Sequence, residues 1–256
     1  MTGLLPVTPS FRLDGKRALI AGASSGIGLA AAVALADARA EVTLAARSSD
    51  KLEPLARTLR ERGSIVETVC LDVCDPAAID HVVHNRAAFE ILVNSAGVAR
   101  HGPAIETEVS DFDHVVGTNL RGAYFLTRAI AKTLIAANKP GSLINISSQM
   151  GHVGGIDRAV YSATKHAVEG FTKSMAIEWG KHRIRVNTIC PTFIRTPLAE
   201  QTLADPERRR WISEKIKLGR LGEVEDIMGA VVFLASDASA MITGSALMID
   251  GGWTAG

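Results

Sequence analysis

Short, continuously apolar segments recur along the whole chain, and a longer segment of helical composition follows most of them. Strands that are apolar along their full length, rather than at alternate positions, are typical of parallel sheets covered by helices on both faces. Successive strands joined through helices form right-handed parallel crossovers. The pattern therefore predicts an α/β protein with a doubly wound parallel sheet of about seven strands. The expected strands are 17–21, 41–46, 65–71, 89–94, 142–147, 184–189 and 246–249.

The segments between these strands are the expected helices. No Pro/Ser-rich linker, block of like charge or internal repeat divides the 256 residues. A chain of this length can bury a large core as one unit. We predict a single domain over residues 1–256, in which 1–14 form an N-terminal extension. The expected helices are 27–38, 51–62, 77–86, 112–137, 161–179, 199–217 and 223–234.

Charge and apolar content argue against several classes of partner. The 28 Lys and Arg residues nearly balance the 27 Asp and Glu residues, so net charge gives no reason to expect nucleic-acid binding. No apolar run reaches the ~18 residues that span a bilayer, and the N-terminus lacks the pattern of a signal peptide. We therefore expect a cytoplasmic protein with no nucleic-acid or membrane partner.

The three cysteines, Cys70, Cys74 and Cys190, are too few for a disulfide framework. Cys70 and Cys74 stand four residues apart, but no second pair completes a zinc site. The sequence therefore predicts no metal centre and favours small core side chains for all three. Sparse cysteines of this kind fit a reducing cytoplasm.

The first strand runs directly into a glycine-rich turn. Its spacing, G-x-x-x-G-x-G, differs from the G-x-G-x-x-G dinucleotide fingerprint but relies on the same physics. Glycines permit a tight turn and let the backbone approach a pyrophosphate, while the next helix directs free N–H groups at the anion. By itself, an ordinary strand–helix turn explains the pattern too. The residues of the predicted phosphate site are Gly22, Ser24, Ser25, Gly26, Ile27 and Gly28.

The end of the second strand bears on which dinucleotide binds. An Asp or Glu there usually holds the ribose 2′-hydroxyl of NAD, but here no acid is present and Arg47 follows Ala46 directly. A guanidinium binds a 2′-phosphate through several donors, so the sequence favours NADP(H) over NAD(H). Asp72 and Val73 follow the third strand, where the carboxylate either accepts from the adenine amino group or caps the next segment.

Tyr161 and Lys165 stand four residues apart in a predicted helix, so they share one face. A phenol is a weak proton donor at neutral pH, but a neighbouring ammonium favours the phenolate. The pair therefore predicts a general acid/base. Ser148, thirteen residues before Tyr161, ends a strand, where its hydroxyl either bonds a substrate oxygen or caps a turn.

Together these motifs resemble those of the short-chain dehydrogenase/reductase family, a Rossmann-type fold. The shared features are the glycine-rich turn, Asn94-Ser95-Ala96-Gly97, Asn119, Ser148, Tyr161-x-x-x-Lys165 and Asp250-Gly251-Gly252, in family order from about residue 15 to residue 253. The second half looks similar to the L-xylulose (dicarbonyl) reductase branch and related carbonyl reductases. The resemblance implies an NADP(H)-dependent oxidoreductase that works as a homotetramer.

The resemblance also implies roles for individual residues. Tyr161 would give or take the proton, Lys165 would tune it and bind the nicotinamide ribose, and Ser148 would stabilise the carbonyl. Asn119 would hold a water that links Lys165 to solvent. The other residues implied to contact the cofactor are Asn94, Ala96, Gly97, Pro191, Ile194 and Thr196.

The chain departs from the family pattern at three positions. Ala21 replaces the usual Thr, Ser95 the usual second Asn, and Thr192 the usual Gly after Pro191. Ala21 removes one hydrogen bond of the turn, and Thr192 should stiffen or reshape the nicotinamide loop. None of these changes removes a catalytic group.

The substrate is less well defined than the reaction. The resemblance implies a small polar carbonyl or alcohol: a ketose, a sugar acid or an α-dicarbonyl. Gln149 then either donates to the substrate or is an exposed turn residue, and Arg158 either favours an anionic substrate or is a solvated rim charge. We expect residues 197–217 to form a substrate lid and interpret His152 as a loop residue. The alternatives are reduction of 3-oxoacyl thioesters or steroid-like carbonyls, and dinucleotide binding without chemistry.

Overall fold

A computed structural model describes residues 5–256 and contains one seven-stranded, all-parallel sheet. The order across the sheet is β3-β2-β1-β4-β5-β6-β7, which confirms the predicted doubly wound α/β fold. The strands are β1 (Arg17–Ala21), β2 (Glu41–Ala46), β3 (Val66–Cys70), β4 (Ile91–Asn94), β5 (Gly141–Ile146), β6 (Ile184–Pro191) and β7 (Ala246–Ile249).

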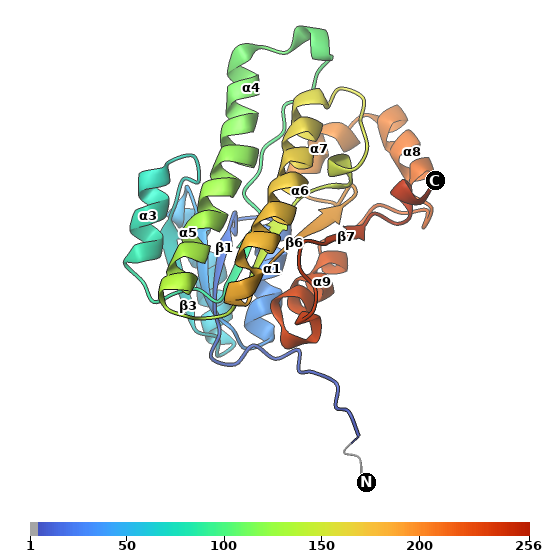
Figure 1. Ribbon diagram of the computed structural model, residues 1–256. Helices are drawn as coiled ribbons and strands as arrows, with labels where there is room; N and C mark the ends of the chain where they lie inside the picture. The colour runs from blue at the N-terminus through green and yellow to red at the C-terminus, as the bar shows by residue number, and fades with distance from the viewer. Residues whose placement is uncertain (1–4) are drawn as a thin grey trace.

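Helices cover both faces of the sheet, so the central strands are buried on both sides (Figure 1). One layer contains α1 (Gly26–Asp37), α2 (Glu53–Glu61) and α9 (Glu225–Ala235). The other contains α3 (Pro76–His84), α5 (Ala123–Ala136) and α6 (Ala159–Trp179), with α4 (Val109–Val116) beside α6. This double cover is why the strand segments are apolar throughout rather than alternating.

The strand order reverses at β1, because β2 lies on one side of it and β4 on the other. Ala21, the last residue of β1, pairs with Ala45 in β2 and with Asn94 in β4. The chains that leave β1 and β4 diverge beyond this point. Ligands of doubly wound sheets bind in the crevice at such a switch point, outside the carboxyl ends of the strands.

Two predicted helical segments are interrupted in the structure. The segment predicted over 112–137 begins earlier, at Val109, and contains a π-helical turn (η3, Gly117–Gly122) between α4 and α5. The segment over 199–217 is two helices, α7 (Pro197–Leu203) and α8 (Pro206–Lys215). Asp205 begins α8 by accepting from the backbone N–H groups of Glu207 and Arg208, an N-cap that separates the helices.

The prediction of core cysteines is right for Cys190 and wrong for Cys70, which is exposed, while Cys74 is half-buried. Cys70 ends β3, an edge strand that only β2 pairs with, so less of it is covered. In the N-terminal extension, residues 1–4 lie outside the described residues, and Leu13 packs into the core. No helix in residues 5–256 is long and apolar enough to cross a membrane.

Candidate active site

One cavity of about 350 Å3 lies at the carboxyl ends of the strands, at the switch point. The residues that meet there come from the glycine-rich turn after β1, the ends of other strands, α6 and the loop after β6. Most of the residues singled out from sequence line it: Gly22, Ser24, Ser25, Gly26, Ile27, Arg47, Asp72, Val73, Ala96, Gly97, Ser148, Gln149, Arg158, Tyr161, Lys165, Pro191, Ile194 and Thr196.

Three predicted site residues, Gly28, Asn94 and Asn119, are not among those lining the cavity. Gly28 lies inside the turn, where an added Cβ would overlap the carbonyl oxygen of Gly22. Asn94 is buried, and its Nδ2 donates to Oδ1 of Asn145 at 3.2 Å. These residues therefore support the walls of the cavity from behind.

The glycine-rich turn brings the backbone close to the cavity. Gly22 has φ of +80°, and a Cβ there would lie 2.8 Å from the backbone nitrogen of Ala96. Both the conformation and the close approach therefore require glycine. Ser25 precedes α1 without a side-chain cap, so the first N–H groups of the helix are free for an anion. A bound pyrophosphate fits this turn.

Arg47 and Asp72 follow β2 and β3 at the outer end of the cavity. Both are exposed and line it. The Asp72 carboxylate accepts from the backbone N–H of Cys74 at 2.9 Å, while Asp75 rather than Asp72 caps α3. No acid stands at the end of β2, so the guanidinium of Arg47 is the charged group at that position.

Tyr161 and Lys165 lie one turn apart in α6, as predicted, with the Lys165 Nζ 5.5 Å from the centroid of the Tyr161 ring. Lys165 is only 5% exposed, and its ammonium donates to the carbonyl oxygen of Ile146 at the end of β5, at 2.8 Å. This bond holds the ammonium beneath the phenol.

Ser148 follows β5 at the same edge of the sheet. Its hydroxyl accepts from the backbone N–H of Met150 at 3.1 Å and caps the short helix η4 (Gln149–Gly151). The hydroxyl hydrogen is not used in that bond. Ser148 therefore satisfies both interpretations of the sequence, since it caps a turn and lines the cavity.

Asn119 lies in the π-helical turn, a feature that sequence periodicity does not reveal and that is common at functional sites. Its side-chain oxygen accepts from the backbone N–H of Val98, and its Nδ2 donates to the Val98 carbonyl, both at 2.8 Å. Both ends of the amide are thus occupied. The Nδ2 also lies 3.4 Å from the hydroxyl of Thr164, so the side chain connects the loop after β4 to the helix that carries Lys165.

Arg158 is not a solvated rim charge. Its guanidinium lies 5.2 Å from the centroid of the Phe193 ring, one nitrogen donates to the imidazole of His101, and another donates to the hydroxyl of Thr202 at 2.9 Å. Burial lowers the pKa of Arg158, and burial together with the Arg158 charge lowers the pKa of His101 to about 4. A neutral imidazole is the form that accepts a hydrogen bond from arginine.

His101, Phe193 and Thr202 were not predicted as cavity residues. They come from loops after β4 and β6 and from α7, and all three line the cavity with Arg158. His101 and Arg158 are 57 positions apart in the chain. No local motif connects such residues, so only the fold brings them together.

Gln149 is not an exposed turn residue. It is 1% exposed, and neither its Oε1 nor its Nε2 has a hydrogen-bond partner among residues 5–256. A buried amide without partners costs stability, and a catalytic role is one physical explanation for such a group. Gln149 follows Ser148 directly and lines the same cavity.

The chain is similar in sequence and in fold to known oxidoreductases. A family model described as enoyl-(acyl carrier protein) reductase matches residues 22–254. D-erythrulose reductase of Gallus gallus is 39% identical over 96% of this chain and 98% of its own, and L-xylulose reductase of Bos taurus is 38% identical over 95% and 98%. A crystal structure of gluconate 5-dehydrogenase from Burkholderia cenocepacia, in complex with NADP and tartrate, is 36% identical, covers 96% of this chain and 98% of its own, and has a TM-score of 0.91.

The fold, the site and these similarities define an oxidoreductase that uses NAD(P) and acts on CH–OH groups or the corresponding carbonyls. In such enzymes the cofactor carries the hydride, and the protein orients the reactants. The chain belongs to the short-chain dehydrogenase/reductase family.

Proposed function

We propose that this enzyme transfers a hydride between NADP(H) and a small polar carbonyl or alcohol: a ketose, a sugar acid or an α-dicarbonyl. The meeting of Ser148, Tyr161 and Lys165 on one cavity carries the proposed reaction. The amide of Gln149, beside Ser148, supports a polar substrate, since neither of its polar atoms has a partner among the described residues. A site with unpaired hydrogen-bonding groups discriminates strongly in favour of substrates that pair them. A polyhydroxylated or dicarbonyl substrate does so, and an alkyl chain does not.

In the proposed mechanism, Tyr161 is the general acid/base. In reduction, its phenol gives a proton to the carbonyl oxygen as negative charge develops there, and the Ser148 hydroxyl stabilises that charge by donating to the same oxygen. Lys165, held by Ile146, stabilises the phenolate that remains. The nicotinamide cofactor supplies the hydride when bound. Oxidation of the alcohol uses the same groups in reverse.

The proposed cofactor site follows the lining of the cavity. Gly22, Gly26 and Ile27 would hold the pyrophosphate at the start of α1, with Ser24 and Ser25 beside it, while Gly28 keeps the turn packed. The adenosine side is supported by Asp72, Val73, Ala96 and Gly97, and the nicotinamide side by Lys165, Pro191, Ile194 and Thr196. Asn94 underlies this wall with a buried Oδ1 that lacks a partner.

A preference for NADP(H) over NAD(H) rests on Arg47. Its exposed guanidinium follows β2 and lines the cavity, where the adenosine ribose of a dinucleotide lies in this fold. No carboxylate stands at the end of that strand to repel a 2′-phosphate. Multiple donors from one guanidinium favour the phosphate over a neutral hydroxyl.

Among small polar carbonyls and alcohols, Arg158 favours substrates that carry a carboxylate. Its charge has no ion-pair partner in residues 5–256, because the neighbouring Asp157 pairs with Arg208 at 2.6 Å instead. The guanidinium keeps unused donors on a partly desolvated cavity wall, where an anion binds more strongly than in water. The names of similar proteins, with erythrulose, xylulose and gluconate as substrates, support a sugar-like reactant.

One observation favours a second candidate, reduction of an acyl thioester. The matching family model carries the description enoyl-(acyl carrier protein) reductase, and the proposed lid, residues 197–217, exposes Leu198 beside the cavity. A thioester substrate would place an apolar chain there. Gln149 and Arg158 favour the polar substrates over this candidate.

The proposed assembly is a homotetramer in the cytoplasm. Exposed apolar side chains support it: Tyr124 on α5, Ile177 on α6, 83% exposed, and Met241 before β7, 98% exposed. Contact between subunits would remove these side chains from water. Three free cysteines fit a reducing compartment. Sedimentation at micromolar concentration tests the assembly, and a monomeric mass contradicts it.

The proposed function is tested by following the oxidation of NADPH, and separately of NADH, with a panel of carbonyl substrates. The panel contains ketoses, diacetyl, keto-sugar acids and an acetoacetyl thioester, and the Tyr161→Phe variant serves as the matched control. We expect turnover with NADPH on the sugar-like or dicarbonyl substrates, and a loss of about 100-fold or more in the variant. Turnover on the thioester alone contradicts the proposed substrate, and an undiminished variant contradicts the mechanism.

A further inference from the structure

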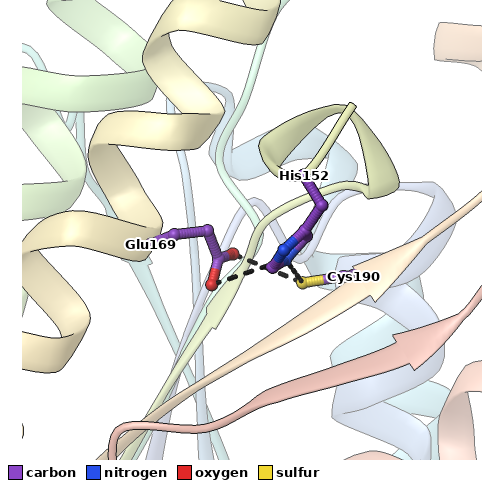
Figure 2. A group of neighbouring side chains, drawn as sticks. All are labelled: His152, Glu169 and Cys190. Carbon is purple, nitrogen blue, oxygen red and sulfur yellow. Dashed lines mark hydrogen bonds and ion pairs between the residues drawn. The ribbon is translucent and has the colours of Figure 1, made fainter. Parts of the chain in front are cut away.

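Three side chains from distant parts of the chain meet at one point (Figure 2). His152 follows η4, Glu169 lies one turn after Lys165 in α6, and Cys190 lies near the end of β6. The Cys190 thiol is 3.3 Å from Oε1 of Glu169 and 3.5 Å from Nε2 of His152, and that nitrogen is 3.7 Å from Oε2 of Glu169. No other group of three His, Cys, Asp or Glu side chains comes together this closely in the described part of the chain.

The two distances from the Cys190 sulfur lie within the range of edges of a zinc coordination tetrahedron, and the 3.7 Å between His152 and Glu169 is slightly longer. With Zn–S of about 2.3 Å and Zn–N and Zn–O of about 2.0 Å, tetrahedral ligand atoms lie roughly 3.3–3.6 Å apart. One sulfur, one imidazole nitrogen and one carboxylate are also the donor types that Zn2+ prefers. The cluster thus has the chemistry and the size to accept the ion with small side-chain movements.

The surroundings also favour a bound cation. Glu169 is buried, and its charge is met by neutral donors such as Thr188, whose hydroxyl donates to Oε2 at 2.9 Å. Ser147 is 3% exposed, and its Oγ makes no hydrogen bond with any residue that the structure describes. An added Cβ on Gly151 would lie about equally close to Ser147 Oγ and to the Glu169 side chain, at 3.0 and 3.1 Å. Both groups thus lie against Gly151, which precedes His152 in the chain.

An ion can reach the cluster without crossing the cavity. The His152 side chain is 31% exposed, so one ligand opens toward solvent. None of His152, Glu169 or Cys190 lines the cavity described above. The cluster is therefore separate from the reacting groups.

We propose that His152, Glu169 and Cys190 form a Zn2+ site that holds together the segments supporting the active site. The ion replaces the thiol proton of Cys190, which passes to solvent, and the other two ligands bind through lone pairs. Each ligand is close in sequence to residues that line the cavity. His152 follows η4, Glu169 lies one turn after Lys165, and Cys190 directly precedes Pro191. Bound zinc would therefore stabilise the fold at this edge of the sheet.

The test uses tag-free protein stripped with a chelator and then titrated with Co2+, whose thiolate complexes absorb in the near ultraviolet. We expect one Co2+ per chain with a thiolate charge-transfer band, displacement of the band by Zn2+, and a higher melting temperature with Zn2+. These readouts do not depend on turnover, so they stand apart from the proposed function.

Two variants remove ligands, and one serves as control. His152→Ala changes a partly exposed side chain, so the fold should survive, and it should weaken metal binding at least about tenfold. Cys190→Ser should lose the charge-transfer band, while Cys70→Ser, which changes an exposed thiol, should keep it. A stripped protein that binds no stoichiometric metal overturns the proposal and leaves the cluster a hydrogen-bonded network. Binding that His152→Ala leaves unchanged overturns it too.

Discussion

Replacing Gln149 by methionine separates the stability of this enzyme from its recognition of substrate. The Gln149 amide is buried, and both of its polar atoms lack partners. Each unsatisfied buried polar group costs about 1–3 kcal/mol, and methionine has a similar volume without the polar atoms. Because Gln149 lies on a cavity wall rather than in the deep core, we take the low end of the range.

We therefore expect Gln149→Met to raise the free energy of unfolding by about 1 kcal/mol. For a chain of this length, that corresponds to an increase of about 2–4 °C in melting temperature. The same substitution removes one or two hydrogen bonds to a polar substrate and should lower kcat/KM about 10- to 100-fold. Most mutations lower the stability of a protein, so a higher melting temperature would be a stringent test of this reasoning.

The assay combines thermal unfolding without cofactor and steady-state kinetics on the best substrate of the panel. Gln149→Glu is the matched control, because it keeps the shape and adds a buried charge, and it should lower both stability and activity. A Gln149→Met enzyme with unchanged melting temperature and kcat/KM within twofold of the parent would refute the reasoning. It would mean that the amide is satisfied in solution and does not contact substrate.

Three further predictions concern charged groups around the cavity. Arg47→Gln should raise the KM for NADPH about tenfold or more and leave that for NADH nearly unchanged; a parallel change in both would argue against a 2′-phosphate contact. Arg158→Gln should raise the KM for a sugar acid about tenfold while that for a neutral ketose changes less, and equal changes would argue against recognition of a carboxylate. The pKa of His101 is lowered from 6.5 to about 4 by burial and by Arg158, so the unfolded chain binds this proton more readily. The stability contributed by the neutral imidazole is present above pH 6.5 and is lost as pH falls toward 4. In the His101→Gln variant the free energy of unfolding should fall over this pH range by about 1–2 kcal/mol less than in the parent, a figure reduced to allow for solvent screening. Denaturant titrations at a series of pH values measure the difference, and an unchanged pH dependence would contradict the shift.

Local sequence predicts the features of this enzyme that depend on neighbouring residues. The apolar strand segments, the glycine-rich turn and the four-residue spacing of Tyr161 and Lys165 each appear in the structure as expected. Each is set by backbone conformation or helical periodicity, which act over a few residues. The order of these motifs along the chain was sufficient to predict the family and the general location of the site.

Helix interruptions were harder to predict. The π-helical turn around Asn119 occurs inside a segment with ordinary helical composition, and a single turn is too short for hydrophobic periodicity to distinguish from the α-helix around it. The break at Asp205-Pro206, by contrast, carries an N-cap followed by a proline and could have been recognised from local sequence.

Contacts between distant segments were decided by the tertiary structure alone. The sequence left Arg158 and Gln149 each with two interpretations, and the fold half-buries Arg158 and fully buries Gln149 at the cavity. His152, Glu169 and Cys190 share no local motif, yet three elements carry them to one point. The burial of a side chain and the meeting of distant side chains depend on how helices and strands pack against one another. Local sequence patterns do not reveal that packing. The sequence by itself thus determined the architecture and the reaction chemistry, whereas the polar lining of the cavity and the cluster behind it emerged only from tertiary packing.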